Sequence, residues 1–422
     1  MQYEETMQVD YFSRRNVMPI WKKNLYVCWI GVFFAAIGMS EVAPILPLYV
    51  SHLGIHNPSL VSQLSGITFG VTYIITAIFS PIWGQAADKV GRKPMILRAG
   101  IGLSVIYLLM GFVPNIYCLI ALSVLQGALT GYSTACNTLI ATQTDKAHVG
   151  YALGTLSTAS VAGSLLGPTL SGFVEAVLGL RAVFFIISGL LLIAFVITLL
   201  FVQESFVRSE KKSQGLREIW NSVPQKELTI VILITFFVLG IGLYSIEPIM
   251  TQYVSQLSPN ASHIALIAGL VFSATGLSNI ISAPLLGKLS DRIGPHKVII
   301  FALIVAGILY IPQAFVQNPW QLLVLRFLLG FAMGGLLPSV SIMIKKITPD
   351  FLTGRIFGFN MSLGYLGVAA GSILGGQIAG RFGFQYVFYI TSTLMFVNAV
   401  WVYFRVYKKW DQAVVQAPLG TK

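Results

Sequence analysis

GQAADKVGRK at residues 84–93 is a short, charge-rich polar segment that interrupts two long apolar stretches. A related segment, GKLSDRIGPHK, occupies residues 287–297. In both, an aspartate stands three residues before a glycine, as Asp88 does before Gly91 in the first copy. Such charged runs are not stable in hydrocarbon. The pattern therefore predicts two tight loops at a membrane face, joined by membrane-spanning segments.

The composition agrees with a membrane protein. The 422 residues are 55% hydrophobic and only 10% charged, which is too apolar for a water-soluble chain of this length. The formal net charge of +12 comes from basic residues scattered between apolar spans, so it does not indicate a nucleic-acid partner. The three cysteines have no paired spacing, so we interpret them as small apolar core residues and predict neither a disulfide framework nor a metal site.

Twelve apolar segments are each long enough to cross a bilayer as a helix. We therefore predict an all-α membrane protein that spans the bilayer twelve times. The first span follows a polar segment, residues 1–24, and is too long for a cleaved signal peptide. The predicted spans are 25–50, 62–86, 95–113, 117–141, 149–176, 182–203, 228–255, 263–287, 297–315, 320–344, 353–380 and 385–406.

The basic residues predict the orientation of the spans. If the N-terminus is cytoplasmic, every Lys and Arg except Arg181, Arg326 and Arg381 falls in or beside a cytoplasmic segment. This bias follows the positive-inside rule. It predicts a multi-pass protein of the plasma membrane, the inner membrane of a bacterium, with both termini and the tail 408–422 in the cytoplasm.

The chain divides into two related halves. A polar segment, 204–227, separates 25–203 from 228–407 and is interpreted as a cytoplasmic linker that can also contain a short surface helix. At an offset of 203 or 204 residues, glycines and aspartates of the first half recur in the second. We therefore predict two six-helix bundles in parallel repeat, with a transport site between them. The matched pairs are Gly84 with Gly287, Asp88 with Asp291, Gly127 with Gly330 and Gly167 with Gly371.

The loop after the second span carries a complete family motif. It resembles the Gly-x-x-x-Asp-x-x-Gly-Arg-Lys loop of the major facilitator superfamily, and the chain is similar to that superfamily's twelve-helix bacterial drug:proton antiporters. The resemblance implies the major facilitator fold, transport by alternating access, and a loop that latches the two halves in the outward-facing state. The alternative is a plain turn in which Gly91 adopts a positive φ angle. The motif residues are Gly84, Asp88, Gly91, Arg92 and Lys93.

The second copy of this loop is incomplete. Asp291 and Gly294 are kept, but Pro295 and His296 replace the Arg-Lys pair. We therefore expect a weaker gating role for Asp291 than for Asp88.

The fifth span carries a second motif, GSLLGPTLSG at residues 163–172. It resembles the antiporter signature Gly-x-x-x-Gly-Pro-x-x-Gly-Gly, with Ser171 in place of one glycine, and this resemblance implies export. Small residues four apart also allow close helix packing, so a simple tight crossing is the alternative. The motif residues are Gly163, Gly167, Pro168 and Gly172.

Three charged residues lie inside predicted spans, where a charge is costly unless it is paired or faces water. A carboxyl group at Glu41 can exchange protons and attract a cationic drug, or it can form a structural hydrogen bond in a helix broken by proline. Glu247 aligns with Ala43, so it either lines the cavity or lies near the outer face. Arg326 either takes part in coupling, neutralises Glu247, or binds carbonyl groups at a helix end.

The fourth span departs from the family pattern. Its Ser123, Gln126 and Gly127 align with an Arg-x-x-Gln-Gly motif whose arginine is tied to proton coupling in related antiporters. Three interpretations stay open: Glu41 couples alone, Arg326 substitutes from the second half, or coupling differs from the family. Further cavity candidates are polar or aromatic residues in apolar spans, although such residues also form interfacial belts. They are Tyr73, Gln126, Tyr132, Asn137, Tyr244, Asn279, Asn360 and Tyr365.

The sequence therefore predicts a monomeric secondary transporter, powered by the proton gradient, that exports amphipathic cationic or zwitterionic drugs. We predict no cofactor, no metal, no catalytic residue and no ATP-driven step, because phosphate-binding and nucleophile motifs are absent. Two alternatives stay open. One is export of an endogenous metabolite, such as a siderophore, a sugar or a lipid precursor. The other is a non-transporting membrane sensor.

Overall fold

The computed structural model describes residues 19–145, 147–206, 220, 222–261 and 263–407. The described chain is helical and contains twelve segments long and apolar enough to cross a membrane, which confirms the predicted fold class. The predicted segments 1–24 and 204–227 are described only in part, and the tail 408–422 lies outside the described residues.

The first half contains α2 (Ile20–His52), α3 (Pro58–Val90), α4 (Arg92–Met110), α5 (Ile116–Leu129), α6 (Tyr132–Gln143), α7 (Val149–Leu178) and α8 (Leu180–Phe201). The second half begins with α10 (Lys226–Tyr244), the short helix η1 (Glu247–Ile249) and α11 (Met250–Leu257). It continues with α12 (Ile264–Ile293), α13 (Pro295–Gln313), α14 (Pro319–Met333), α15 (Leu336–Ile347), α16 (Asp350–Phe382), α17 (Phe384–Val402) and η2 (Tyr403–Tyr407).

Three spans are broken where the sequence predicted continuous helices. The fourth is interrupted between Thr130 and Gly131, because Gly131 has a φ of +127° that ends α5. The tenth is interrupted at two consecutive glycines between α14 and α15. The seventh passes through η1, where Pro248 follows Glu247. The predictions of continuous helices at 117–141, 228–255 and 320–344 were wrong, because apolar periodicity does not register a local break.

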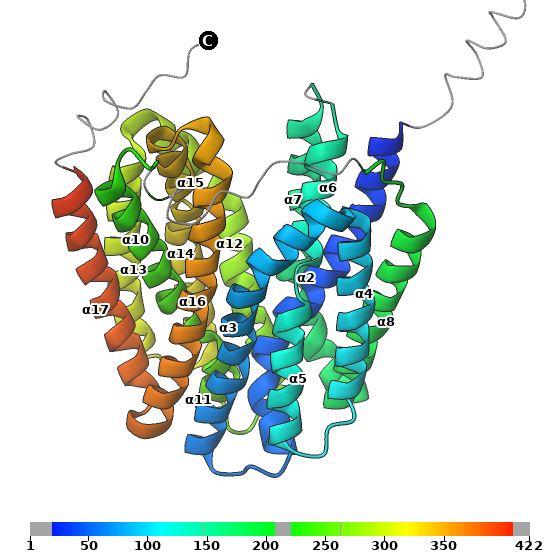
Figure 1. The fold of residues 1–422 in the computed structure, drawn as a ribbon. Helices are drawn as coiled ribbons and strands as arrows, with labels where there is room; N and C mark the ends of the chain where they lie inside the picture. Colours follow the sequence, from blue (N-terminus) through cyan, green and yellow to red (C-terminus); the bar gives the residue numbers. More distant parts are fainter. Residues whose placement is uncertain (1–18, 146, 207–219, 221, 262, 408–422) are drawn as a thin grey trace, which may run out of the picture.

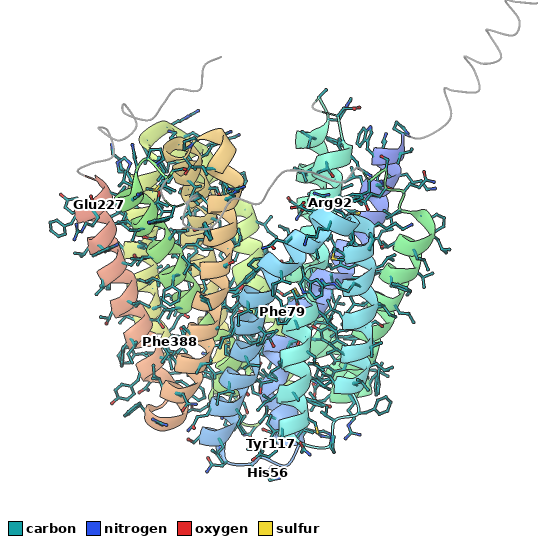
Figure 2. All side chains as sticks on the ribbon, in the orientation of Figure 1. His56, Phe79, Arg92, Tyr117, Glu227 and Phe388 are labelled. Atoms are coloured by element: carbon teal, nitrogen blue, oxygen red, sulfur yellow. The ribbon has the colours of Figure 1, made fainter. Side chains whose placement is uncertain are left out.

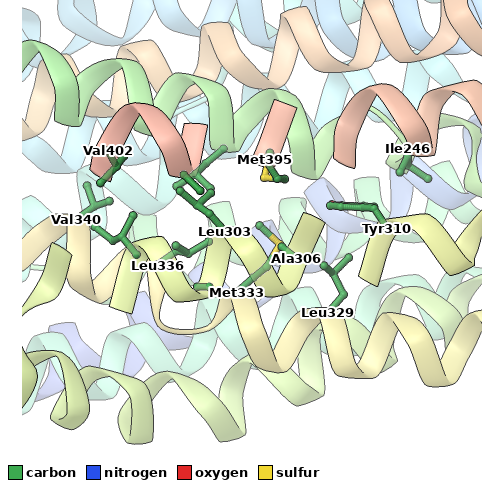
Figure 3. Close-up of a cluster of buried hydrophobic side chains, with 14 of the residues drawn as sticks. Ile246, Leu303, Ala306, Tyr310, Leu329, Met333, Leu336, Val340, Met395 and Val402 are labelled. Atoms are coloured by element: carbon green, nitrogen blue, oxygen red, sulfur yellow. The ribbon is translucent and has the colours of Figure 1, made fainter. Parts of the chain in front are cut away.

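The two halves are built from the same internal contacts. Tyr49 donates a hydrogen bond to the carbonyl oxygen of Met110 at 2.5 Å, and Tyr253 donates to that of Gln313 at 2.7 Å. A second pair, Tyr107 and Tyr310, repeats in the same way. Each half also has its own hydrophobic core, and Figure 3 shows part of the second. The repeat seen in the sequence is therefore a repeat of packing.

The halves meet chiefly along two helix pairs, α3 with α16 and α7 with α12 (Figure 1). Glycines bring the backbones together: a side chain added at Gly376 of α16 would lie 2.5 Å from the carbonyl oxygen of Ser62 on α3. On the other pair, a side chain at Gly172 would lie 2.5 Å from the carbonyl oxygen of Ala265. Such close approaches are typical of helix packing in membranes. The hydrophobic effect does not drive helices together in lipid, so they associate through the van der Waals packing that small residues allow.

Hydrogen bonds between the halves cluster toward one end of the molecule. Thr251 donates to the carbonyl oxygen of Pro44 at 2.6 Å, and Ser62 donates to the side chain of Gln252 at 2.6 Å. We call this the closed end; it includes the turn between α2 and α3, where Figure 2 labels His56. The other end carries Arg92 and the loop motifs, and there the ribbons of the two halves diverge (Figures 1 and 2). We call this the motif end.

Candidate functional site

A pocket that is open to solvent lies between α3, α4 and the α5–α6 break, and Tyr365 of α16 contributes from the second half. Its wall consists of hydroxyl groups, aromatic rings and one guanidinium group. In the part of the chain that the structure describes, no group of three His, Cys, Asp or Glu side chains is placed to hold a metal ion. The lining residues are Thr76, Ser80, Trp83, Gly84, Ala87, Met95, Arg98, Thr130, Gly131, Thr134, Ala135, Thr138 and Tyr365.

Four aromatic rings form a cluster across the two halves, and one of them, Tyr365, lines this cavity. Tyr73 of α3 lies 6.1 Å, between ring centroids, from both Tyr244 of α10 and Tyr365 of α16. Phe69, one turn earlier on α3, lies 5.1 Å from Tyr73 and 6.3 Å from Tyr244. The structure thus brings three predicted residues together from both halves. Flat apolar ligands favour such walls.

Glu41 lies in α2 and is only 4% exposed. Its carboxyl group has no hydrogen-bond partner among the described residues, but it is close enough to Tyr107 for an electrostatic interaction. Tyr107 donates to the carbonyl oxygen of Gly38 at 2.9 Å, and Gln126 donates to the Tyr107 hydroxyl at 2.8 Å. A chain of polar groups therefore connects the family-related Gln126 to the turn of α2 that carries Glu41.

Glu247 and Arg326 lie near each other in the second half. Arg326 is 4% exposed and interacts electrostatically with Glu247, although the two do not form a direct ion pair in the described structure. Two of its nitrogens, Nε and Nη2, have no hydrogen-bond partner among the described residues. Glu247 also interacts electrostatically with Tyr73 and Tyr244, which places it beside the aromatic cluster.

The first loop motif is bound within its own half. Asp88 accepts a hydrogen bond from Arg92 at 2.8 Å, and the Asp88 side chain remains 63% exposed. The Glu204 carboxylate accepts from the backbone N–H groups of Arg92 and Lys93, at 2.8 and 2.7 Å, and so caps α4. Lys93 in turn donates to the carbonyl oxygen of Val202, at 2.7 Å, just after α8. Asp291, the counterpart of Asp88 in the second half, is also exposed.

The second motif lies in the seam between the halves. A side chain at Gly163 would lie 2.6 Å from the carbonyl oxygen of Phe33 on α2, and one at Gly167 would lie 3.0 Å from that of Ile37. The residues that follow face α12 of the second half. The carbonyl group of Pro168 packs against Gly269 of α12, close to the contact that Gly172 makes with Ala265. The stretch therefore fits α7 against one helix of each half.

The remaining predicted residues are not gathered at one point. Tyr132 lies in the core of the first half, where it is 2% exposed and shares a 2.9 Å hydrogen bond with Thr198. Asn137 is exposed on α6, and Asn279 is half-buried on α12. Asn360 is buried on α16, and its Oδ1 has no hydrogen-bond partner among the described residues.

Sequence reasoning missed Tyr107 and the pair formed by Trp83 and Arg98. Arg98 was grouped with the cytoplasmic cations, although the structure places it inside α4 at the cavity wall. Tyr107 carried a usable signal: Tyr310, 203 residues later, donates to the carbonyl oxygen of Gly242 at 3.1 Å, as Tyr107 does to that of Gly38. Comparing all aromatic residues at the repeat offset finds this pair.

The sequence and the fold were compared with known proteins. The family model described as "Major Facilitator Superfamily" matches residues 28–267 and 232–419. The chain is 43% identical over 386 residues to the multidrug resistance protein MdtG of Citrobacter koseri, covering 91% of this chain and 95% of that protein. MdtG of Salmonella paratyphi C is equally similar, with 96% of its length covered.

Solved transporters share the fold. A bacterial homologue of the human lysosomal transporter Spinster, described as inward-facing and unoccupied, aligns with a TM-score of 0.74 and 12% identity, over 96% of this chain and all of the other. The human organic anion transporter MFSD10 aligns with a TM-score of 0.67 and 17% identity, over 91% of this chain and all of the other. With the family model and the relatives of similar length, these likenesses lead to one conclusion: this multi-pass membrane protein belongs to the major facilitator superfamily.

Proposed function

We propose that this chain is a secondary active exporter of amphipathic drugs that works by alternating access and is coupled to protons. The observation that carries the proposal is the 43% identity, over 91% of the chain, to proteins named for multidrug resistance. The cavity agrees with it, because aromatic rings and a few polar groups suit flat, chemically varied ligands better than one hydrophilic metabolite.

The asymmetry between the two ends supports alternating access. The lysines and arginines gather toward the motif end, so the positive-inside rule places that end and both termini in the cytoplasm of a plasma membrane. The structure then corresponds to an inward-facing state of a monomer, with a cavity ready to take substrate from the cytoplasm. The export step closes the motif end and opens the closed end, and the exposed Asp88, here paired with Arg92, can exchange that partner for a latch to the second half.

Proton coupling is assigned to Glu41. Burial favours the neutral form of a carboxyl group, so a proton taken up at one face of the membrane can be held here while the protein changes state. Tyr107, which binds the carbonyl oxygen of Gly38 on α2 and accepts from Gln126 on α5, links this event to α4 and α5, in place of the family arginine that Ser123 replaces. Glu247 and Arg326 form a second charged site that can respond to substrate in the other half.

A panel of dyes tests the proposed function. Bacterial cells that lack their main exporters and express this chain should accumulate less of several unrelated amphipathic dyes, cationic and zwitterionic. The Gly376→Leu variant, in which α3 and α16 cannot approach, is the inactive control. Reduced accumulation of only one compound contradicts a multidrug exporter, and unchanged accumulation of all of them contradicts export.

A further inference from the structure

Arg98 occupies an unusual position at the cavity wall. Its guanidinium carbon lies 3.7 Å from the ring centroid of Trp83, and Nη2 donates to the carbonyl oxygen of Thr130 at 3.2 Å. Trp83 donates through Nε1 to the carbonyl oxygen of Ala128 at 2.6 Å. Both side chains therefore bind carbonyls at the end of α5, where the fourth span is broken.

The second half interrupts the equivalent span without a cation, at Gly334 and Gly335, whose backbone dihedral angles stay in the helical region. At the repeat offset of 203 residues, Leu286 stands where Trp83 stands and Phe301 where Arg98 stands. The break between α14 and α15 is covered by the apolar side chains of Leu286 and Val298. A Cβ added at Gly335 would lie 2.7 Å from Leu286 and 3.1 Å from Val298. The second half thus accommodates its milder interruption without an arginine, and the sharper break at Gly131 accounts for only one of the guanidinium nitrogens of Arg98, Nη2.

The guanidinium group is incompletely paired. Nε and Nη1 are buried and have no hydrogen-bond partner among the described residues, and no ion pair formed within them includes Arg98. Arg98 as a whole is half-buried, and a cation without a counter-charge in a membrane-spanning helix usually marks a ligand path. The cavity wall beside it contains hydroxyl groups, from Thr134 and Thr138 on α6, and no carboxylate.

We propose that Arg98 and the adjacent hydroxyl groups form a subsite for the carboxylate of a zwitterionic substrate. This inference rests on the proposed export function and refines its substrate class. A guanidinium fork pairs with a carboxylate through two parallel N–H donors, which the free nitrogens can supply after a small rotation of the side chain. The aromatic cluster around Tyr73 and Tyr365 then faces the ring system of the same ligand.

Two matched dyes test the subsite. A rhodamine methyl ester is a cation, and its free acid is a zwitterion with the same ring system. We expect purified wild-type protein in proteoliposomes to transport both dyes. We expect Arg98→Gln to reduce transport of the free acid by about tenfold or more, the loss typical of a charge-assisted hydrogen bond, and to spare the ester. For Arg98→Lys, which keeps the charge but not the fork, we expect transport of the free acid to lie between that of wild type and that of Arg98→Gln.

The controls separate this inference from a structural role and from the proposed function. Arg292→Gln removes an exposed cation from the second half and should leave both dyes unchanged. Equal loss of both dyes in Arg98→Gln, or no loss of either, overturns the carboxylate subsite. If the wild-type protein transports neither dye, the export function fails. Fluorescence anisotropy then decides the subsite: it fails if Arg98→Gln binds the free acid as tightly as wild type.

Discussion

Single residues show how the two halves divide their roles. Both halves use a buried tyrosine, Tyr107 or Tyr310, to hold the first helix of the half. Each tyrosine also lies near a carboxyl group, Glu41 in the first half and Glu247 in the second, but among the described residues only Tyr107 also accepts a hydrogen bond, from Gln126. Polar groups in a low-dielectric interior are strongly coupled, so this small network is suited to sense a proton.

Replacing Tyr107 with Phe tests the network. The change removes two hydrogen bonds and leaves Gln126 and the carbonyl of Gly38 without their partner, so we expect a loss of about 1–2 kcal/mol in the free energy of unfolding. Tyr310→Phe removes one hydrogen bond and should cost about half as much. Unfolding in detergent, followed by circular dichroism, measures both. Equal losses would contradict the added role of Gln126.

Glu41→Gln tests the assignment of coupling to one residue. The amide keeps the size of the side chain but cannot exchange a proton, so we expect gradient-driven export to fall at least about tenfold while dye binding persists. Glu175→Gln, near the end of α7, is the matched control and should transport normally. Everted membrane vesicles give the rates. Normal export by the Glu41 variant removes the assignment.

Pairs of helices determine which end of the molecule is open. Glycines on α3, α7, α12 and α16 let backbones approach at the closed end, whereas no comparable contact joins the described parts of the halves at the motif end. These backbone contacts are either formed or broken, because closely packed atoms cannot be compressed into intermediate arrangements. These crossings therefore act as a two-state seal.

Gly376→Leu should open this seal. The added side chain would overlap the α3 backbone near Ser62, so we expect the closed end to become accessible and transport to fall by about tenfold or more. Gly189→Leu is the control, since nothing lies within 4 Å of an added Cβ there. The measurement is labelling of a Thr251→Cys variant by an impermeant maleimide, in a background with the exposed Cys118 replaced by Ser. Unchanged labelling contradicts the proposed seal.

Glu204 should stabilise the loop motif in the present state. Its carboxylate caps α4 through two backbone N–H groups, so Glu204→Ala should cost about 1 kcal/mol in the free energy of unfolding. Glu227→Ala, which breaks an exposed ion pair with Arg405, should cost less. Thermal unfolding of the two variants compares them. A larger loss for Glu227→Ala would contradict the capping role.

At the scale of the whole molecule, the chain is a duplicated bundle whose halves keep the same packing and differ in their charges. Glu41, Arg98 and Ser123 in the first half align with Tyr244 or Ser245, Phe301 and Arg326 in the second. The conserved packing lets the halves rock against each other as similar bodies. The proposed proton site at Glu41, the proposed subsite at Arg98 and the Asp88 motif all lie in the first half, and the second half contributes Glu247 and Arg326.

Much of this organisation could be predicted from the sequence, because bilayer thickness and the repeat constrain span number and pairing. The aromatic residues Tyr73, Tyr244 and Tyr365 were predicted and lie together. The breaks at Gly131 and Glu247 were not predicted, because each depends on one or two local dihedral angles inside an apolar run. Arg98 was counted with the cytoplasmic cations at the start of the span 95–113, since charge near a helix start does not reveal whether the side chain lines a cavity.

Proton-driven accumulation of ethidium in proteoliposomes tests the central claim most directly. Ethidium is permanently cationic, so it is not trapped by protonation in an acidic lumen. We expect the purified chain to concentrate ethidium when the lumen is acidic, and we expect an ionophore that collapses the gradient to abolish this accumulation. Protein-free liposomes give the background. Protein-dependent ethidium movement of the same size with and without the gradient would contradict proton-coupled export.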